Sequence, residues 1–215
     1  MKALALLIVA ACGDNRSLPI DAAIDSPSGT PDLALIGSLM DPSIELTTDI
    51  FDASACEVVE GCIDAPGTRH LLRFDVITAN RGTADLYLGP TPPAGVSDGI
   101  FVWSACHMHH HVMGYADFTL RDMNDQIVIS GRKQAFCLED DIQATPGGPS
   151  HGYRCNFQGI TVGWADVYDR AQACQWIDVT SVTPGTYTLR VEIDPNNEFP
   201  DADRSNNVWS HTVSF

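Results

Sequence analysis

Short alternating stretches of apolar and polar residues, broken by turn residues, constrain this fold more than any other feature of the sequence. Strand patterns cover residues 69–80, 84–88, 99–112, 116–121, 126–130, 175–179, 186–193 and 208–215. The clearest of them places four apolar residues on one face: Tyr187, Leu189, Val191 and Ile193. No segment carries a long period of 3.6 residues, and the glycine- and proline-rich residues 140–165 are interpreted as a long irregular loop. The pattern predicts an all-β fold, an antiparallel β-sandwich with long irregular loops.

The first 30 residues differ in composition from the rest. Residues 1–12 hold one positive charge and a short apolar run, which is typical of an export signal. The run ends at Cys12 in the form of a bacterial lipobox, which predicts a lipidated cysteine; an ordinary short signal with an incidental cysteine is the alternative. Residues 13–30 are typical of a flexible tether, so the domain is expected to span residues 31–215. We expect an exported protein, lipid-anchored at Cys12 in the bacterial cell envelope or at the cell surface.

Cysteine count and charge narrow the class of protein. Six cysteines follow Cys12, and an even number in an exported chain predicts three disulfides without deciding their connectivity. No CxxC pair occurs, which argues against a cysteine-ligated zinc site. The formal net charge of −16 argues against nucleic acid as a partner. Such a surface would attract cationic substrates such as amines, although charge alone is explained as well by solubility.

A histidine tract is the strongest chemical signal. Four of the seven histidines lie within residues 107–111, and three of them alternate: His107, His109 and His111. Alternate side chains of a strand share one face, so three imidazoles on one strand can converge on one metal ion. Imidazole suits zinc, copper, iron or nickel, and three protein ligands leave the open position of a catalytic site. The alternative is a tag-like tract on a solvated loop.

Two further clusters give the tract a context. They are Gly131–Asp140 (GRKQAFCLED) and Trp164–Asp178 (WADVYDRAQACQWID). With them, the chain resembles the catalytic domain of the lysyl oxidases. The copper motif of that family, a tryptophan shortly before Cys-His-x-His-x-His, is matched by Trp103 and by Cys106–His111. The family's lysine lies in Gly-x-Lys-x-x-Phe-Cys-Leu-Glu-Asp, and its tyrosine lies six residues before the cysteine of Cys-Gln-Trp-Ile-Asp, as Tyr168 does here.

The resemblance implies a copper-dependent amine oxidase. It makes His107, His109 and His111 the copper ligands, and Lys133 and Tyr168 the catalytic residues that form a lysine tyrosylquinone cofactor. Such an enzyme converts primary amines, peptidyl lysine among them, to aldehydes and releases ammonia and hydrogen peroxide. The expected partners are a primary amine or a lysine-containing protein and O2, with no nucleic acid and with membrane contact only through Cys12. In isolation, Lys133 would be a surface lysine and Tyr168 a half-buried core tyrosine.

The resemblance also implies structural links. The implied disulfides are Cys56–Cys106, Cys62–Cys174 and Cys137–Cys155. It further implies a Ca²⁺ site that ties the start of the domain to its end, with these residues: Asp32, Leu33, Asp201, Asp203, Asn206 and Asn207. Oxygen-rich side chains at this density suit calcium. The alternative is a turn before the last strand in which these side chains cap their own backbone.

The sequence leaves two non-catalytic functions possible and does not identify the catalytic base. The chain could be a β-sandwich that holds Zn²⁺ or Cu²⁺ for storage or stability, or a surface adhesion module stiffened by calcium and disulfides. The catalytic base is not assigned by the sequence, which offers three carboxylates: Asp117, Asp122 and Asp169.

Overall fold

The structure is a computed structural model that describes residues 29–132 and 137–215. Some of the expectations above fall outside the described residues. These are the signal segment with Cys12, residues 13–28 of the expected tether, and Lys133. Within the described part of the chain, no helix is long and apolar enough to cross a membrane.

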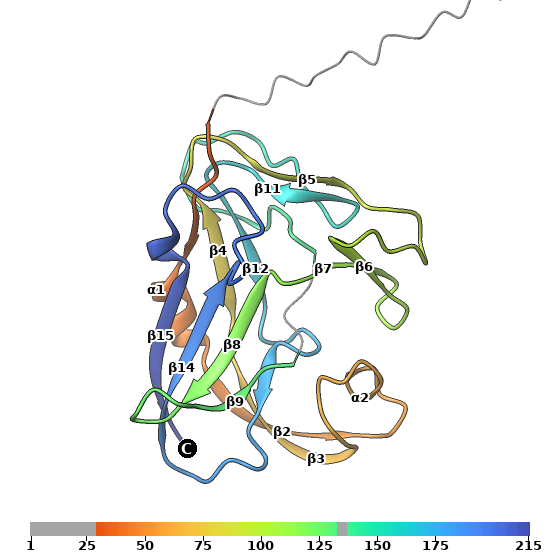
Figure 1. The fold of residues 1–215 in the computed structure, drawn as a ribbon, viewed down its shortest axis with the longest axis vertical. Coiled ribbons are helices and arrows are strands. Elements are labelled where there is room, and N and C mark those ends of the chain that lie inside the picture. Colours follow the sequence, from red (N-terminus) through yellow and green to blue (C-terminus); the bar gives the residue numbers. More distant parts are fainter. Residues whose placement is uncertain (1–28, 133–136) are drawn as a thin grey trace, which may run out of the picture.

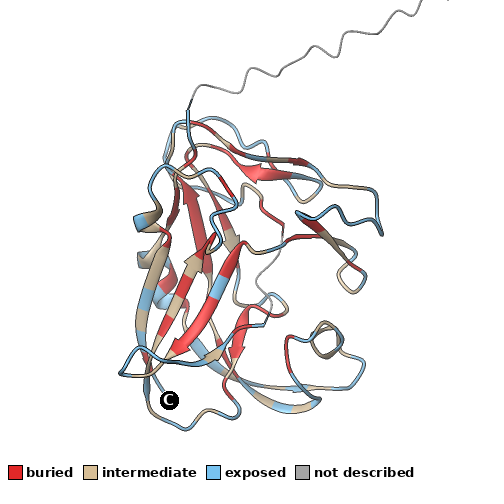
Figure 2. Cartoon of the chain, in the orientation of Figure 1, coloured by how far each residue is buried: buried red, intermediate tan, exposed pale blue. Residues whose placement is uncertain are grey.

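Two four-stranded antiparallel sheets form the body of the molecule (Figure 1). The first has the order β1 (Leu33–Leu35), β4 (Val76–Asn80), β12 (Trp164–Tyr168) and β10 (Ile142–Gln143). The second has the order β15 (Val208–Ser214), β14 (Thr186–Ile193), β8 (Ala116–Arg121) and β9 (Ile127–Ser130). Apolar side chains of both sheets meet in one buried cluster, and the buried residues concentrate in these strands (Figure 2). The predicted all-β fold is confirmed.

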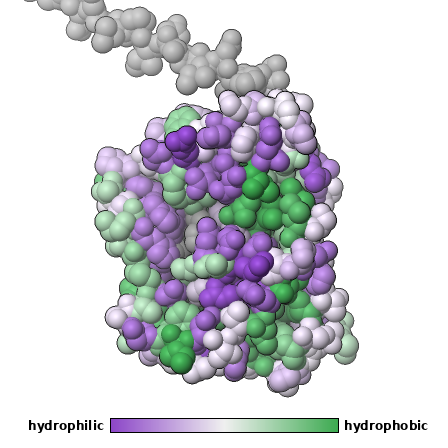
Figure 3. Space-filling view, turned by 180° about the vertical axis from the view of Figure 1, so that it is seen from behind, coloured by the Kyte–Doolittle hydropathy of each residue, from purple (hydrophilic) through white to green (hydrophobic). Residues whose placement is uncertain are grey.

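Within residues 29–132 and 137–215, three smaller sheets and four short helical segments complete the fold. The sheets are β13 (Trp176–Asp178), β3 (Gly67–Arg73) and β2 (Glu45–Phe51); β11 (Phe157–Ile160) and β5 (Leu86–Pro90); and β6 (Phe101–Ser104) and β7 (His109–Val112). The helical segments are α1 (Gly37–Met40), α2 (Cys56–Val59) and the 3-10 turns η1 (Asp41–Ser43) and η2 (Arg204–Asn206). On the face seen in Figure 3, hydrophilic residues cover much of the middle of the molecule and hydrophobic residues form separate groups.

Strand β14 shows how alternation of apolar and polar residues places one face of a strand on the core. Leu189, Val191 and Ile193 are fully buried, as their alternation predicts, while the intervening side chains are partly exposed. The strand lies between β8 and β15, so one face packs on the core. Burying each aliphatic side chain contributes roughly 1.5–3 kcal/mol, which is what holds the register.

The interpretation of residues 140–165 as one irregular loop is wrong in part. Strands β10 and β11 and the start of β12 lie there, and each pairs with a neighbour: β10 with β12, β11 with β5, and β12 with β4. Gly159 is needed where β11 shifts register, because a side chain there would collide with the Leu86 carbonyl and the Tyr153 ring. These ladders join distant segments, so local composition does not reveal them.

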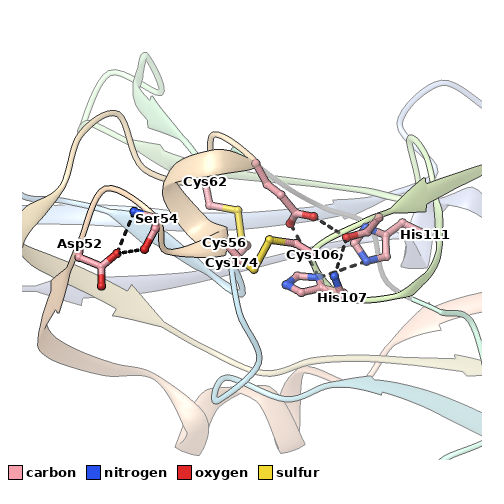
Figure 4. Close-up of a disulfide and its surroundings, with 10 residues drawn as sticks. Asp52, Ser54, Cys56, Cys62, Cys106, His107, His111 and Cys174 are labelled. Atoms are coloured by element: carbon pink, nitrogen blue, oxygen red, sulfur yellow. Dashed lines mark hydrogen bonds and ion pairs between the residues drawn. A yellow bond between two sulfur atoms is a disulfide. The ribbon is translucent and has the colours of Figure 1, made fainter. Parts of the chain in front are cut away.

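Three disulfides hold the loops. They join Cys56 to Cys106, Cys62 to Cys174, and Cys137 to Cys155, which are the pairs implied by the resemblance. The first two anchor both ends of the α2 segment, one to the histidine tract and one to the chain that follows β12. Figure 4 shows the Cys56–Cys106 bridge next to His107 and His111.

Candidate active site

The histidine tract forms a β-hairpin, and the expectation of three ligands on one strand is wrong for His107. Strands β6 and β7 pair with Ser104 opposite His109. His109 and His111 belong to β7, whereas His107 lies in the turn of residues 105–108. The chain reverses there with Met108 in the left-handed region, at φ 59°. The reversal lies inside residues 99–112, which the sequence pattern predicts as one strand, and no glycine marks a turn between residues 100 and 112.

The three imidazoles nevertheless meet. His111 Nε2 lies 3.0 Å from His109 Nε2 and 3.4 Å from His107 Nδ1. Nitrogen ligands at about 2.0–2.1 Å from one metal, at angles of about 90–110°, lie about 2.9–3.4 Å apart, so this spacing fits a shared ion. The three residues form a group whose ligand atoms all lie within 4.8 Å of one another. The donor set therefore suits a metal that accepts imidazole.

The fourth histidine of the tract points elsewhere. His110 is buried and its Nε2 lies 2.8 Å from the Val96 carbonyl, with its ring 5.0 Å from the Trp103 ring. His111 is also buried, at 5 % exposure, while His107 and His109 are partly exposed. The tract is thus part of the packed hairpin rather than a solvated tail.

A cavity of about 110 Å³ lies beside the hairpin. His109 and Tyr168 both line it, together with Cys137, Glu139, Asp141, Cys155, Asp166, Val167 and Gln172. Tyr168 is the last residue of β12 and is almost fully buried, with its ring 5.7 Å from that of Tyr115. The Cys137–Cys155 bridge forms part of the cavity wall. One histidine of the trio and the predicted cofactor tyrosine therefore line the same cavity.

Three carboxylates of this cavity were missed by the sequence reasoning. Burial raises the pKa of Glu139, and the neighbouring Asp141 raises it further. Burial likewise raises the pKa of Asp141, although its carboxylate accepts a hydrogen bond from the Val167 backbone N–H at 2.8 Å. The fully buried Asp166 has its pKa raised well above the usual value by desolvation, while the Glu139 N–H donates to it at 3.0 Å. Alternation along β12, which puts Asp166 and Tyr168 on one face, was the available signal.

None of the three carboxylates considered from the sequence lines the cavity. Asp117 is exposed on β8 opposite Glu192. Asp122 accepts hydrogen bonds from the backbone N–H groups of Asn124 and Gln126, as in a turn. Asp169 is exposed and accepts a hydrogen bond from the Ala171 N–H. The carboxylates that line the cavity are instead those of Glu139, Asp141 and Asp166.

The predicted calcium residues come together, although the carboxylate of Asp203 is used elsewhere and only its N–H contacts Asp201, at 3.3 Å from Oδ1. Asn206 Nδ2 donates to Asp32 Oδ1 at 2.8 Å, and Asn207 Nδ2 donates to Asp201 Oδ2 at 2.8 Å. The Leu33 N–H donates to Asp201 Oδ1 at 3.2 Å, so the first strand meets the last turn. Asp203 instead caps η2 by accepting from the Ser205 N–H. The amide oxygens of Asn206 and Asn207 are buried and have no hydrogen-bond partner within the described residues.

The chain is similar in sequence to known proteins over most of its length. A family model described as "Lysyl oxidase" matches residues 49–215. Lysyl oxidase homolog 2 of Mus musculus is 36% identical over 190 residues, which are 83% of this chain and 24% of that protein. Lysyl oxidase homolog 3B of Danio rerio is 40% identical over 190 residues, 81% of this chain and 23% of that protein. The chain spans about a quarter of the length of these curated relatives.

Proposed function

This chain belongs to the lysyl oxidase family, and on that basis we propose that it is a copper-dependent amine oxidase. It would convert primary amines, such as the side chain of peptidyl lysine, to aldehydes and release ammonia and hydrogen peroxide. The observation that carries the proposal is the shared cavity of His109 and Tyr168, beside imidazole nitrogens spaced at 3.0 and 3.4 Å. Non-catalytic storage of a metal would not need the tyrosine there.

The residues present fit the implied cofactors. His107, His109 and His111 would hold copper, for which imidazole is a suitable ligand. Lys133 and Tyr168 would form lysine tyrosylquinone; the proposal for Lys133 rests on its sequence motif. When present, the quinone would supply an electrophilic carbonyl that accepts electrons from a primary amine, and copper would assist their transfer to O2.

The cavity carboxylates would bind and deprotonate the substrate. A primary amine is an ammonium ion at neutral pH and must lose a proton before its nitrogen can act as a nucleophile. Glu139 and Asp141 give the cavity a negative potential that attracts the ammonium group. The raised pKa of Glu139 and of Asp141 makes each a stronger base than an exposed carboxylate, so we propose that these two take up the proton. Asp166, more deeply buried, would orient the amine toward Tyr168.

The organisation of the chain is also part of the proposal. We propose that residues 1–12 are a lipoprotein-type signal, that residues 13–30 tether the domain to Cys12, and that residues 31–215 are the catalytic domain. Pairing of β1 with β4 supports a start near residue 31, and three disulfides fit export. For the Ca²⁺ site we propose five of the six residues, leaving out Asp203 because its carboxylate caps η2.

The decisive experiment uses the scarcity of lysine. Lys133 is the only lysine after Lys2, so digestion of copper-loaded, aerobically purified protein should yield one lysine-containing peptide joined to the Tyr168 peptide. Mass spectrometry should find this cross-link, and the protein should release hydrogen peroxide with a primary amine. Tyr168→Phe and Lys133→Arg should abolish both while retaining copper. A copper-loaded protein whose Lys133 and Tyr168 peptides stay separate would instead be a metal-binding module.

A further inference from the structure

His107 is the ligand that the strand ladder does not hold. His109 and His111 are fixed by pairing of β7 with β6, but His107 lies in the connecting turn. Its backbone N–H donates to Ser104 Oγ at 3.0 Å, and the Met108 N–H donates to the Ser104 carbonyl at 2.8 Å. The position of the His107 ring therefore depends on where the Ser104 hydroxyl is held.

The Ser104 hydroxyl is held by a residue from a different part of the chain. Ser104 Oγ donates to Glu60 Oε1 at 2.5 Å, across 44 residues of sequence. The other carboxylate oxygen, Glu60 Oε2, lies 3.8 Å from His107 Nδ1. This distance is too long for a hydrogen bond but is within the range of an ion pair. The side chains of Glu60 and His107 are 18% and 15% exposed, so their interaction is poorly screened by solvent.

Backbone hydrogen bonding and two nearby disulfides hold the segment that carries Glu60. Glu60 follows α2, and its backbone N–H donates to the Cys56 carbonyl at 2.7 Å. Cys56 is bridged to Cys106, the residue before His107, and Cys62 is bridged to Cys174. Figure 4 shows both bridges, with His107 next to Cys106. The carboxylate is thus carried on a segment tied at one end to the histidine turn.

We propose that Glu60 is a positioning residue for the copper site: it fixes His107 through Ser104 and places a negative charge beside the imidazole. The inference rests on the proposed function, because it assumes that the trio binds copper. Losing a group that orients a metal-ligating histidine from outside the ligand set typically lowers metal affinity roughly 10–100-fold. Glu60 would act through Ser104 and through its charge, because its Oε2 lies nearest Nδ1, the same ring nitrogen that faces His111. A negative charge next to the ligands also stabilises the dication.

The test measures Cu(II) affinity by competition with a chelator, and the electron paramagnetic resonance spectrum of the loaded protein. Glu60→Gln retains an acceptor for Ser104 and removes only the charge, and it should weaken copper binding about 10–100-fold and change the copper hyperfine splitting. Ser104→Ala should act in the same direction, and the double variant should lose less than the product of the two effects. Glu57→Gln is the matched control, since Glu57 lies on α2 and its carboxylate makes no hydrogen bond or ion pair with the described residues.

The outcomes separate this inference from the proposed function. If copper binds the wild type and is lost in His107→Ala, but Glu60→Gln and Ser104→Ala keep wild-type affinity and spectrum, Glu60 has only a structural role and the inference is overturned. If His107→Ala binds copper as tightly as the wild type, the copper site itself is wrong. Melting temperatures of the metal-free variants identify any loss of affinity that comes from unfolding.

Discussion

Removing the Cys62–Cys174 disulfide should destabilise the domain more than removing Cys137–Cys155. The bridges span 112 and 18 residues of sequence. If a bridge acts by limiting the entropy of the unfolded chain, these loop lengths correspond to about 4.8 and about 3.2 kcal/mol at 25 °C. The predicted difference of about 1.6 kcal/mol is large against the total stability of a typical domain.

The perturbation is a pair of alanines in place of each bridge, because a single substitution would leave a reactive thiol. Cys62, Cys174 and Cys137 are buried and Cys155 is partly exposed, so removing Cys62–Cys174 also leaves the larger buried gap. For a domain of this size the two pairs should lower the melting temperature by about 10–19 °C and about 6–13 °C respectively. Cys56→Ala with Cys106→Ala, which opens a loop of 50 residues, should fall between them.

The assay is denaturant unfolding of the oxidised wild type and the three paired variants, followed by circular dichroism, with the slope of the transition checked for a change in the unfolded state. An order of destabilisation that follows loop length supports the reasoning. Equal losses, or a larger loss for Cys137–Cys155, would show that native packing around the bridges, and not chain entropy, sets their contribution.

Three further predictions concern pH, calcium and packing. Because burial raises the pKa of Asp166, the folded protein retains a proton that the unfolded chain loses above about pH 4. The stability that this group contributes is therefore present at low pH and falls as pH rises. Asp166→Asn should remove this contribution to the pH dependence, which is checked by measuring the free energy of unfolding from pH 4 to 8. Calcium at about 100 times its Kd should stabilise the wild type by about 2.7 kcal/mol, and Asp201→Asn should reduce this gain. The measurement is a thermal-shift titration with EDTA as the reference. A wild-type melting temperature that does not change with calcium would contradict the predicted site. Gly159→Ala should destabilise the protein by about 1–3 kcal/mol in denaturant unfolding, whereas Gly152→Ala, where a side chain meets only ordinary contacts, should not.

Part of the site could be predicted because its signals are local. The alternation of His109 and His111 is a property of one strand, and their convergence follows from the pleat. The tyrosine could be located only through its spacing to a cysteine motif, since nothing in its own surroundings distinguishes it from a core tyrosine. For His107 the strand expectation was wrong, because the sequence contains no signal for where the hairpin reverses.

The cavity carboxylates and Glu60 could not be predicted in this way. Asp166 lines the cavity because β12 pairs with β4, which lies far earlier in the chain. Glu60 reaches Ser104 across 44 residues, with a disulfide holding the two segments together. In a chain with many acidic residues, nothing in the local sequence distinguishes Asp166 or Glu60 from a solvent-exposed carboxylate.

By itself, the sequence determined the fold class, the even set of cysteines, the imidazole donors and the family resemblance, because periodicity, residue count and motif spacing are properties of short stretches. Only the tertiary structure decided which strands pair within residues 140–165, which acids share a cavity with Tyr168, and what holds His107 in place. The physical reason is that these features are contacts between segments distant in sequence. Their geometry is set by the packing of the whole core, and no local pattern encodes it.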